Sequence, residues 1–218
     1  MIVRRRSLDI ALLIGGAVVL ATSALAARSG VYDWEIALFH AVNGLSDGLR
    51  QGFWILNQYG TAVTIPLVTA VALLFRRWLL AAALAVSGVA VYVLARVIKE
   101  YVARGRPGSL VDVLVERETF APESLGFPSG HAAVSWAITV IVLAQVGRRW
   151  GIVVIGLACV VSLSRMYVGA HVPLDLIGGA ALGVMVGSAA NLLLGVPQRV
   201  PVVERSTSSV EPEPAGIP

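Results

Sequence analysis

Side chains that could do chemistry recur in three short stretches of an otherwise apolar chain. They are Lys99, Arg104 and Arg106; then Ser129, Gly130 and His131; then Ser164, Arg165, His171 and Asp175. Two of the three histidines and the single lysine of the chain lie in these stretches. A metal site is the competing use of two histidines and an aspartate. Three of the cations, Lys99, Arg106 and Arg165, would repel a divalent ion and attract an anion, so the combination favours a phosphate.

The pair His171 and Asp175 is spaced for one face of a helix, because the residues are four apart. A carboxylate bonded to one imidazole nitrogen fixes the tautomer and leaves the other nitrogen free as a base or nucleophile. Taken alone, the pair could equally be a structural hydrogen bond.

The stretch from Pro128 to His131 reads as the start of a helix. Pro128 fixes the backbone, Ser129 is a suitable N-cap, and Gly130 lets a ligand approach the main chain closely. A helix start with free N–H groups favours an anion. An ordinary capped helix is the alternative for this stretch alone.

The composition indicates a membrane protein. The 218 residues are 57% hydrophobic and 14% charged, whereas a soluble domain carries about 25% charged residues. The net charge of +4 comes mostly from arginine groups between apolar runs, a pattern of membrane topology that argues against nucleic-acid binding. The single cysteine, Cys159, lies in an apolar run and is expected to be a buried small side chain.

We predict an all-α, polytopic membrane helix bundle with about six transmembrane helices. The expected spans are 8–27, 61–75, 78–98, 131–147, 150–163 and 172–194. The arginine groups are Arg4 to Arg6, Arg76 with Arg77, Arg148 with Arg149, and Arg199 with Arg205. With six spans all four groups fall on one side, so both termini are expected to be cytoplasmic and the linkers 28–60, 99–130 and 164–171 to face outward.

Several segments leave alternatives open. The first span also resembles a cleaved signal peptide, with its basic start and A-x-A-like end. Segment 32–59 is expected to form one or two interfacial helices. Linker 108–127 is either a lid that selects head groups or a solvated loop. Residues 1–196 are expected to form the membrane domain, and the Pro- and Glu-containing residues 197–218 a disordered cytoplasmic tail.

The three stretches together resemble the signature of the type 2 phosphatidic acid phosphatase superfamily, K-x6-RP, PSGH and SR-x5-H-x3-D. Every position is matched in order, from Lys99 to Asp175. The resemblance implies that His171 is the nucleophile, Asp175 orients it, and His131 protonates the leaving oxygen and later helps water attack. It implies further that Lys99, Arg106, Ser129, Gly130 and Arg165 bind the phosphoryl oxygens, with no metal and no cofactor.

The implied activity is hydrolysis of a lipid phosphate or polyprenyl diphosphate, such as undecaprenyl diphosphate, at the outer face of the plasma (bacterial inner) membrane through a phosphohistidine. A phosphatidic acid or phosphatidylglycerol phosphate phosphatase and a lipid phosphotransferase are alternatives. A membrane transporter is the alternative from another class. The expected partners are the lipid substrate and the bilayer, without nucleic acid or metal; the sequence leaves the oligomeric state open.

Overall fold

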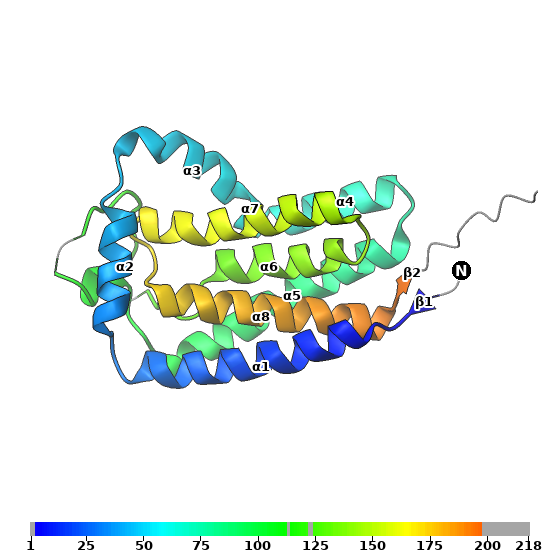
Figure 1. Ribbon diagram of the computed structural model, residues 1–218, viewed down its shortest axis with the longest axis horizontal. Helices are drawn as coiled ribbons and strands as arrows, with labels where there is room; N and C mark the ends of the chain where they lie inside the picture. Colours follow the sequence, from blue (N-terminus) through cyan, green and yellow to red (C-terminus); the bar gives the residue numbers. More distant parts are fainter. Residues whose placement is uncertain (1–2, 113, 122–123, 198–218) are drawn as a thin grey trace, which may run out of the picture.

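The computed structural model describes residues 3–112, 114–121 and 124–197, which form the helical bundle in Figure 1. The described chain contains α1 (Ser7–Arg28), α2 (Asp33–Asn43), η1 (Asp47–Leu49), α3 (Arg50–Asn57), η2 (Gln58–Gly60), α4 (Thr64–Leu74), α5 (Trp78–Val102), η3 (Pro107–Ser109), α6 (Gly130–Leu143), α7 (Arg148–Tyr167) and α8 (Pro173–Leu194). The short strands β1 (Val3–Arg4) and β2 (Val196–Pro197) pair antiparallel. The expected tail after Pro197, with Arg199 and Arg205, lies outside the described residues.

Among the described residues, four helices are long and apolar enough to cross a membrane, namely α1, α5, α7 and α8. A fifth candidate is the segment from η1 to η2 followed by α4, which bend by 64° relative to each other. Helix α6 has 14 residues, fewer than the roughly 20 that a straight span needs. The all-helical membrane fold is therefore confirmed, and the count of six spans stays a prediction.

Helix α6 lies inside the bundle, in contact with α5, α7 and α8. Its close packing against α8 depends on glycine: a Cβ at Gly179 would lie 2.9 Å from the Cβ of Ala132, and one at Gly183 would lie 2.8 Å from the backbone nitrogen of Ala137. Small residues at such contacts let two helix backbones approach within a membrane. This approach brings the first turn of α6 next to the first turn of α8.

Helix α1 packs along α8 at the outside of the bundle. The buried Asp9 accepts a hydrogen bond from Asn191 Nδ2 at 3.2 Å and pairs with Arg6 at 3.1 Å. Farther along, a Cβ at Gly16 would lie 3.0 Å from the carbonyl oxygen of Ala181. In this structure α1 is thus an integral part of the bundle and covers a face of α8; its retention in the mature protein stays a prediction.

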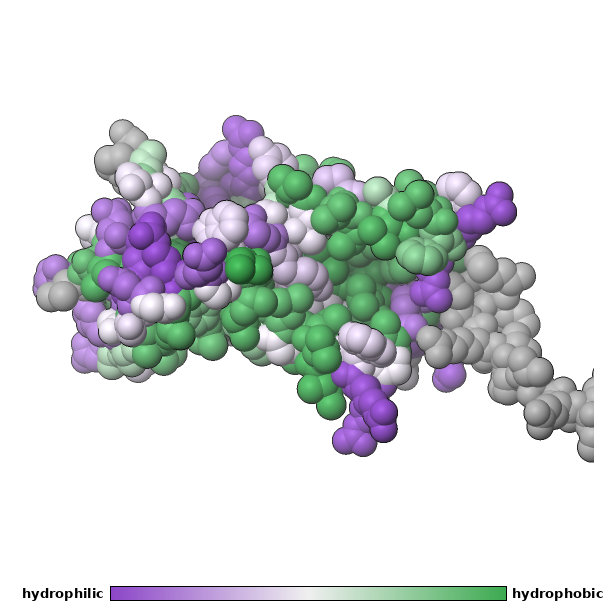
Figure 2. Space-filling model, turned by 90° about the horizontal axis from the view of Figure 1, so that it is seen from above, coloured by the Kyte–Doolittle hydropathy of each residue, from purple (hydrophilic) through white to green (hydrophobic). Residues whose placement is uncertain are grey.

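The bundle has two polar ends. Strands β1 and β2 lie at one end, together with the α4–α5 and α6–α7 corners that carry two of the arginine pairs; α2 crosses the opposite end (Figure 1). Figure 2 shows a hydrophobic band between hydrophilic groups at the two ends. Segment 32–59 contains two helices, α2 and α3, joined by η1. All three chemically capable stretches lie at the α2 end, away from the arginine pairs.

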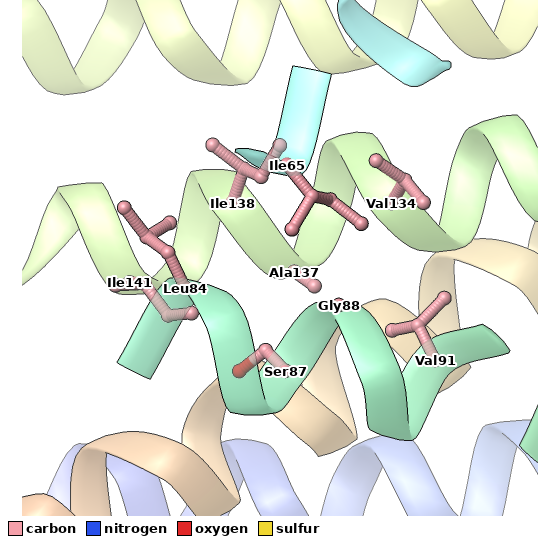
Figure 3. A pocket seen from close by; sticks show the side chains of 9 residues that line it. All are labelled: Ile65, Leu84, Ser87, Gly88, Val91, Val134, Ala137, Ile138 and Ile141. Carbon is pink, nitrogen blue, oxygen red and sulfur yellow. The ribbon is translucent and has the colours of Figure 1, made fainter. Parts of the chain in front are cut away.

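Apolar side chains do not all face the core. Cys159, expected to be buried, is exposed on α7, because in a membrane bundle an apolar run also faces lipid. A cavity of about 10 Å³ lies between α4, α5 and α6, with Ser87 and Ile65 among the side chains that line it (Figure 3). This volume is about that of one water-sized probe, so the helices leave no room there for an alkyl chain.

Candidate active site

The three stretches converge at the α2 end of the bundle because each begins or ends a helix there. Helix α5 ends at Val102, and Ala103 follows with the left-handed φ of 52°. This residue turns the chain back toward the bundle, so Arg104 and Arg106 lie beside the starts of α6 and α8. The corner between α7 and α8 supplies His171.

His171 and Asp175 form a buried pair, but they do not share a helix face as their spacing predicts, because α8 begins only at Pro173. Asp175 Oδ2 lies 3.3 Å from His171 Nδ1 and accepts a hydrogen bond from the backbone N–H of Val172 at 3.2 Å. His171 is 3% exposed and Asp175 is fully buried. Because Nδ1 is engaged by the carboxylate, the Nε2 atom of His171 is the ring nitrogen available for chemistry.

The surroundings of His171 favour its neutral form. Burial lowers the pKa of His171 well below its ordinary value of 6.5, and the positive charges of Arg165, Lys99 and Arg106 lower it further. A neutral imidazole carries the free electron pair that a nucleophile needs. The electrostatics therefore agree with the predicted part for His171 near neutral pH.

The first turn of α6 faces this pair. The backbone N–H of Ser129 donates to the carbonyl oxygen of Asp175 at 2.9 Å, which ties α6 to α8. Ser129 is the N-cap as expected, but its side chain makes no capping hydrogen bond; the buried Oγ has no partner among the described residues. A Cβ at Gly130 would meet nothing within 4 Å, and His131 is close enough to His171 and Arg165 for their charges to interact.

The three predicted phosphate-binding cations are held from different elements. Lys99 donates to the carbonyl oxygens of Leu125 and Gly126 at 2.9 and 3.2 Å. Arg106 donates to Ser124 Oγ at 2.6 Å and to the carbonyl oxygen of Ala170 at 3.0 Å. Arg165 Nη1 donates to Glu118 at 2.8 Å, while its buried Nε has no partner among the described residues.

Several described residues of linker 108–127 contact these cations. Phe120 places its ring 4.1 Å from the guanidinium carbon of Arg106 and 5.9 Å from that of Arg165. Arg117, in the same linker, donates hydrogen bonds to the carbonyl oxygens of Asn43, Leu45 and Tyr167 at 2.7 to 2.8 Å. The described part of the linker thus contacts residues of the site, and both interpretations of it, a lid or a solvated loop, stay predictions.

Sequence reasoning missed two participants. Arg104 was counted among the outer cations without a role, and Glu35 was passed over; the two form a buried ion pair at 2.7 Å that also reaches Asp175. Three residues so far apart in the chain cannot be paired from one sequence. The available signal was an acidic residue, Glu35, directly before Ile36 and two residues before Ala37 in the apolar part of this helix.

The site as a whole is built for an anion. Arg106, Arg165 and Lys99 carry positive charge, no described residue pairs with the Oγ of Ser129, and a Cβ at Gly130 would meet nothing within 4 Å. In the part of the chain that the structure describes, no three His, Cys, Asp or Glu side chains group so as to hold a metal ion. A helical membrane bundle with a histidine–aspartate pair among cations at one end is the arrangement that the resemblance to membrane phosphatases predicts.

The chain belongs to the PAP2 superfamily, whose model matches residues 59–196. It is 36% identical over 154 residues to an undecaprenyl-diphosphatase of Sulfolobus acidocaldarius, covering 69% of this chain and 73% of that protein. It is 36% identical over 138 residues to a decaprenylphosphoryl-5-phosphoribose phosphatase of Mycobacterium tuberculosis, covering 62% of this chain and 72% of that protein.

Two solved structures share the fold. The crystal structure of Aquifex aeolicus LpxE superimposes with a TM-score of 0.68 at 21% identity, covering 73% of this chain and 95% of that chain. That of a transmembrane PAP2-type phosphatidylglycerolphosphate phosphatase from Bacillus subtilis gives a TM-score of 0.65 at 21% identity, covering 84% of this chain and 94% of that chain. The predicted superfamily and membrane fold are confirmed.

Proposed function

We propose that this protein is a metal-independent phosphatase that hydrolyses a lipid phosphate or polyprenyl diphosphate at the outer membrane face through a phosphohistidine on His171. The observation that carries the proposal is the buried His171–Asp175 pair, with an N···O distance of 3.3 Å, within a group of three cations. The similarity to an undecaprenyl-diphosphatase supports the substrate class.

In the first step, Nε2 of His171 attacks phosphorus. The bond from phosphorus to the leaving oxygen breaks, and His131 gives that oxygen a proton. Asp175 stabilises the positive charge that the His171 ring acquires, because its carboxylate already contacts Nδ1. Lys99, Arg106 and Arg165 neutralise the charge on the phosphoryl oxygens, and Ser129 with the N–H groups at the start of α6 adds hydrogen bonds.

In the second step, His131, now neutral, takes a proton from water. The resulting hydroxide attacks phosphorus and the bond to Nε2 breaks. Inorganic phosphate leaves, and both histidines return to their starting states. Because His171 must be neutral to attack while His131 must be protonated to donate its proton, the rate should follow a bell-shaped pH profile.

The location of the site supports a lipid substrate. The site lies at one end of the bundle, where the hydrophobic band of Figure 2 gives way to polar surface, and the predicted topology places this end outside the cytoplasmic membrane. A head group could enter there while its alkyl chains remain in the bilayer. Both termini would then lie on the cytoplasmic side; the pairing of β1 with β2, the first and last described elements, at the opposite end of the bundle supports this.

The proposal is tested by phosphate release from lipids by purified protein in detergent with EDTA. The panel holds polyprenyl diphosphate, phosphatidic acid and phosphatidylglycerol phosphate, with His171→Ala beside the wild type. EDTA-resistant release that His171→Ala abolishes is expected, and the preferred lipid identifies the substrate. Release that EDTA abolishes would refute the metal-independent mechanism, and no release from any lipid would favour phosphoryl transfer or transport.

A further inference from the structure

Arg104 links two buried carboxylates at the back of the site. It donates to Glu35 at 2.7 and 3.2 Å, to Asp175 Oδ1 at 3.3 Å and to the carbonyl oxygen of Gly30 at 3.0 Å. The side chain of Arg104 is 2% exposed, and those of Glu35 and Asp175 are fully buried. The guanidinium therefore acts inside the protein and is not among the groups that face an incoming phosphate.

The two carboxylate oxygens of Asp175 have different partners. Oδ1 is held by Arg104, whereas Oδ2 is left to His171 Nδ1 and to the N–H of Val172. A carboxylate that is held at one oxygen cannot rotate freely about its last torsion. Oδ2 is thereby aimed at Nδ1, so that Nε2 of the same ring is the atom presented to phosphate.

Glu35 holds Arg104 in turn. Its carboxylate takes the two guanidinium hydrogen bonds and also accepts the N–H of Leu174, in the first turn of α8, at 3.0 Å. A negative charge at a helix start is favourable. Glu35 thus ties α2 to the same turn that carries Asp175, across 139 residues of sequence.

Stability alone gives little reason for these charges. Replacing a buried ion cluster by apolar side chains of similar volume is often neutral or stabilising, because desolvation of the charges offsets their attraction. The cluster is best explained by the group that it orients.

We propose that Arg104 and Glu35 form a positioning pair that fixes the Asp175 carboxylate, and through it the His171 imidazole, for attack on phosphorus. This inference rests on the proposed function. Neither residue touches the reacting atoms, so their loss should lower kcat while leaving KM nearly unchanged. Misplacement of a reacting group by about 1 Å costs on the order of 100-fold in rate, and we expect a loss of about 10- to 100-fold.

Substitution of the two residues should also shift the acid limb of the pH profile, the fall in rate as His171 becomes protonated, in opposite directions. The charged or titratable groups around His171 are Asp175, Arg104 and Glu35 on one side, and Arg165, Lys99, Arg106 and His131 on the other. Arg104→Gln removes a positive charge, so the pKa of His171 rises and the limb moves up by about one pH unit. Glu35→Gln removes a negative charge and moves the limb down.

The experiment measures kcat, KM and the acid limb of phosphate release for Arg104→Gln, Arg104→Lys and Glu35→Gln. Arg104→Lys keeps the charge without the planar fork, so it should restore the wild-type limb and only part of kcat. Arg96→Gln is the matched control, because Arg96 lies on α5 in an exposed pair with Glu100 at 3.5 Å. Thermal unfolding in the same detergent reports whether each variant is folded.

A lower kcat with opposite limb shifts in Arg104→Gln and Glu35→Gln would support the positioning pair. Wild-type kcat in both variants, or a loss confined to KM, would overturn it. If Arg104→Gln does not fold, the isosteric Glu35→Gln decides the matter alone. His171→Asn is assayed alongside: full activity of that variant would refute the proposed function itself, which is a different result from a failure of Arg104 or Glu35.

Discussion

Glu118 accepts a hydrogen bond from Arg165, one of the cations that we propose to bind the substrate phosphate. Its Oε2 lies 2.8 Å from Arg165 Nη1, and its side chain is 43% exposed whereas that of Arg165 is 2% exposed. A phosphate that binds Arg165 at Nη1 must first displace this carboxylate, and one that binds at the unpartnered Nε still meets its negative charge. Replacing it by an amide, Glu118→Gln, should therefore make anions bind more tightly.

The magnitude follows from the exposure of the pair. Two charges about 4 Å apart attract by roughly 4 kcal/mol at an effective dielectric constant of 20, but solvent at a half-exposed carboxylate reduces measured pairs to about 0.2–1 kcal/mol. Taking about 1 kcal/mol, the inhibition constant of inorganic phosphate and the KM for lipid should each fall about fivefold. The kcat should stay unchanged, since ground state and transition state gain equally.

The assay is phosphate release at several phosphate concentrations, in low and high salt. The difference between Glu118→Gln and wild type should shrink in high salt, because the carboxylate is partly exposed. Glu116→Gln is the control, since Glu116 lies two residues away in the same linker and is exposed. An inhibition constant that rises in Glu118→Gln, or one that changes equally in Glu116→Gln, would refute the displacement reasoning.

Two further predictions concern packing and pH. Gly179→Ala should lower the stability of the bundle by about 1–3 kcal/mol and reduce activity, because its new Cβ would lie 2.9 Å from that of Ala132 and would also meet the carbonyl oxygen of Ser129. Gly156→Ala is the control, because a Cβ there meets nothing within 4 Å. Thermal unfolding and rate assays should show no loss of stability or activity in this control. Because the pKa of His171 lies well below 6.5, kcat/KM should be level between pH 7 and 6.5 and fall only at more acidic pH. The same depressed pKa means that the unfolded chain binds more protons below pH 6.5, so His171 contributes stability that is lost as the pH falls below that value; an acid limb above pH 6.5, or stability that rises on acidification, would contradict this account.

The sequence predicted the helices well where hydropathy and helix ends agree. Spans 78–98 and 172–194 correspond to Trp78–Val102 and Pro173–Leu194, because an arginine pair and a proline mark their starts. It failed where hydropathy is ambiguous. Span 131–147 ends at Leu143, and Cys159 faces outward, since an apolar side chain suits lipid as well as a protein core.

The contacts of the candidate site were also predictable only in part. His171 and Asp175 are found together as predicted, although His171 precedes α8 and the contact is made across the start of that helix. The contacts of Arg104 with Glu35 and of Glu118 with Arg165 span 69 and 47 residues. Such pairs depend on how α2 and the linker fold back over the bundle, which no local pattern in one sequence encodes.

The most direct test of the central claim is to trap the phosphorylated enzyme. Protein is mixed with lipid phosphate labelled in its phosphoryl group, quenched in base, and digested to locate the label. The proposed mechanism predicts a base-stable, acid-labile phosphate on His171, on the Nε2 atom, that is absent in His171→Asn. Label on another residue, or full turnover by His171→Asn, would contradict the account.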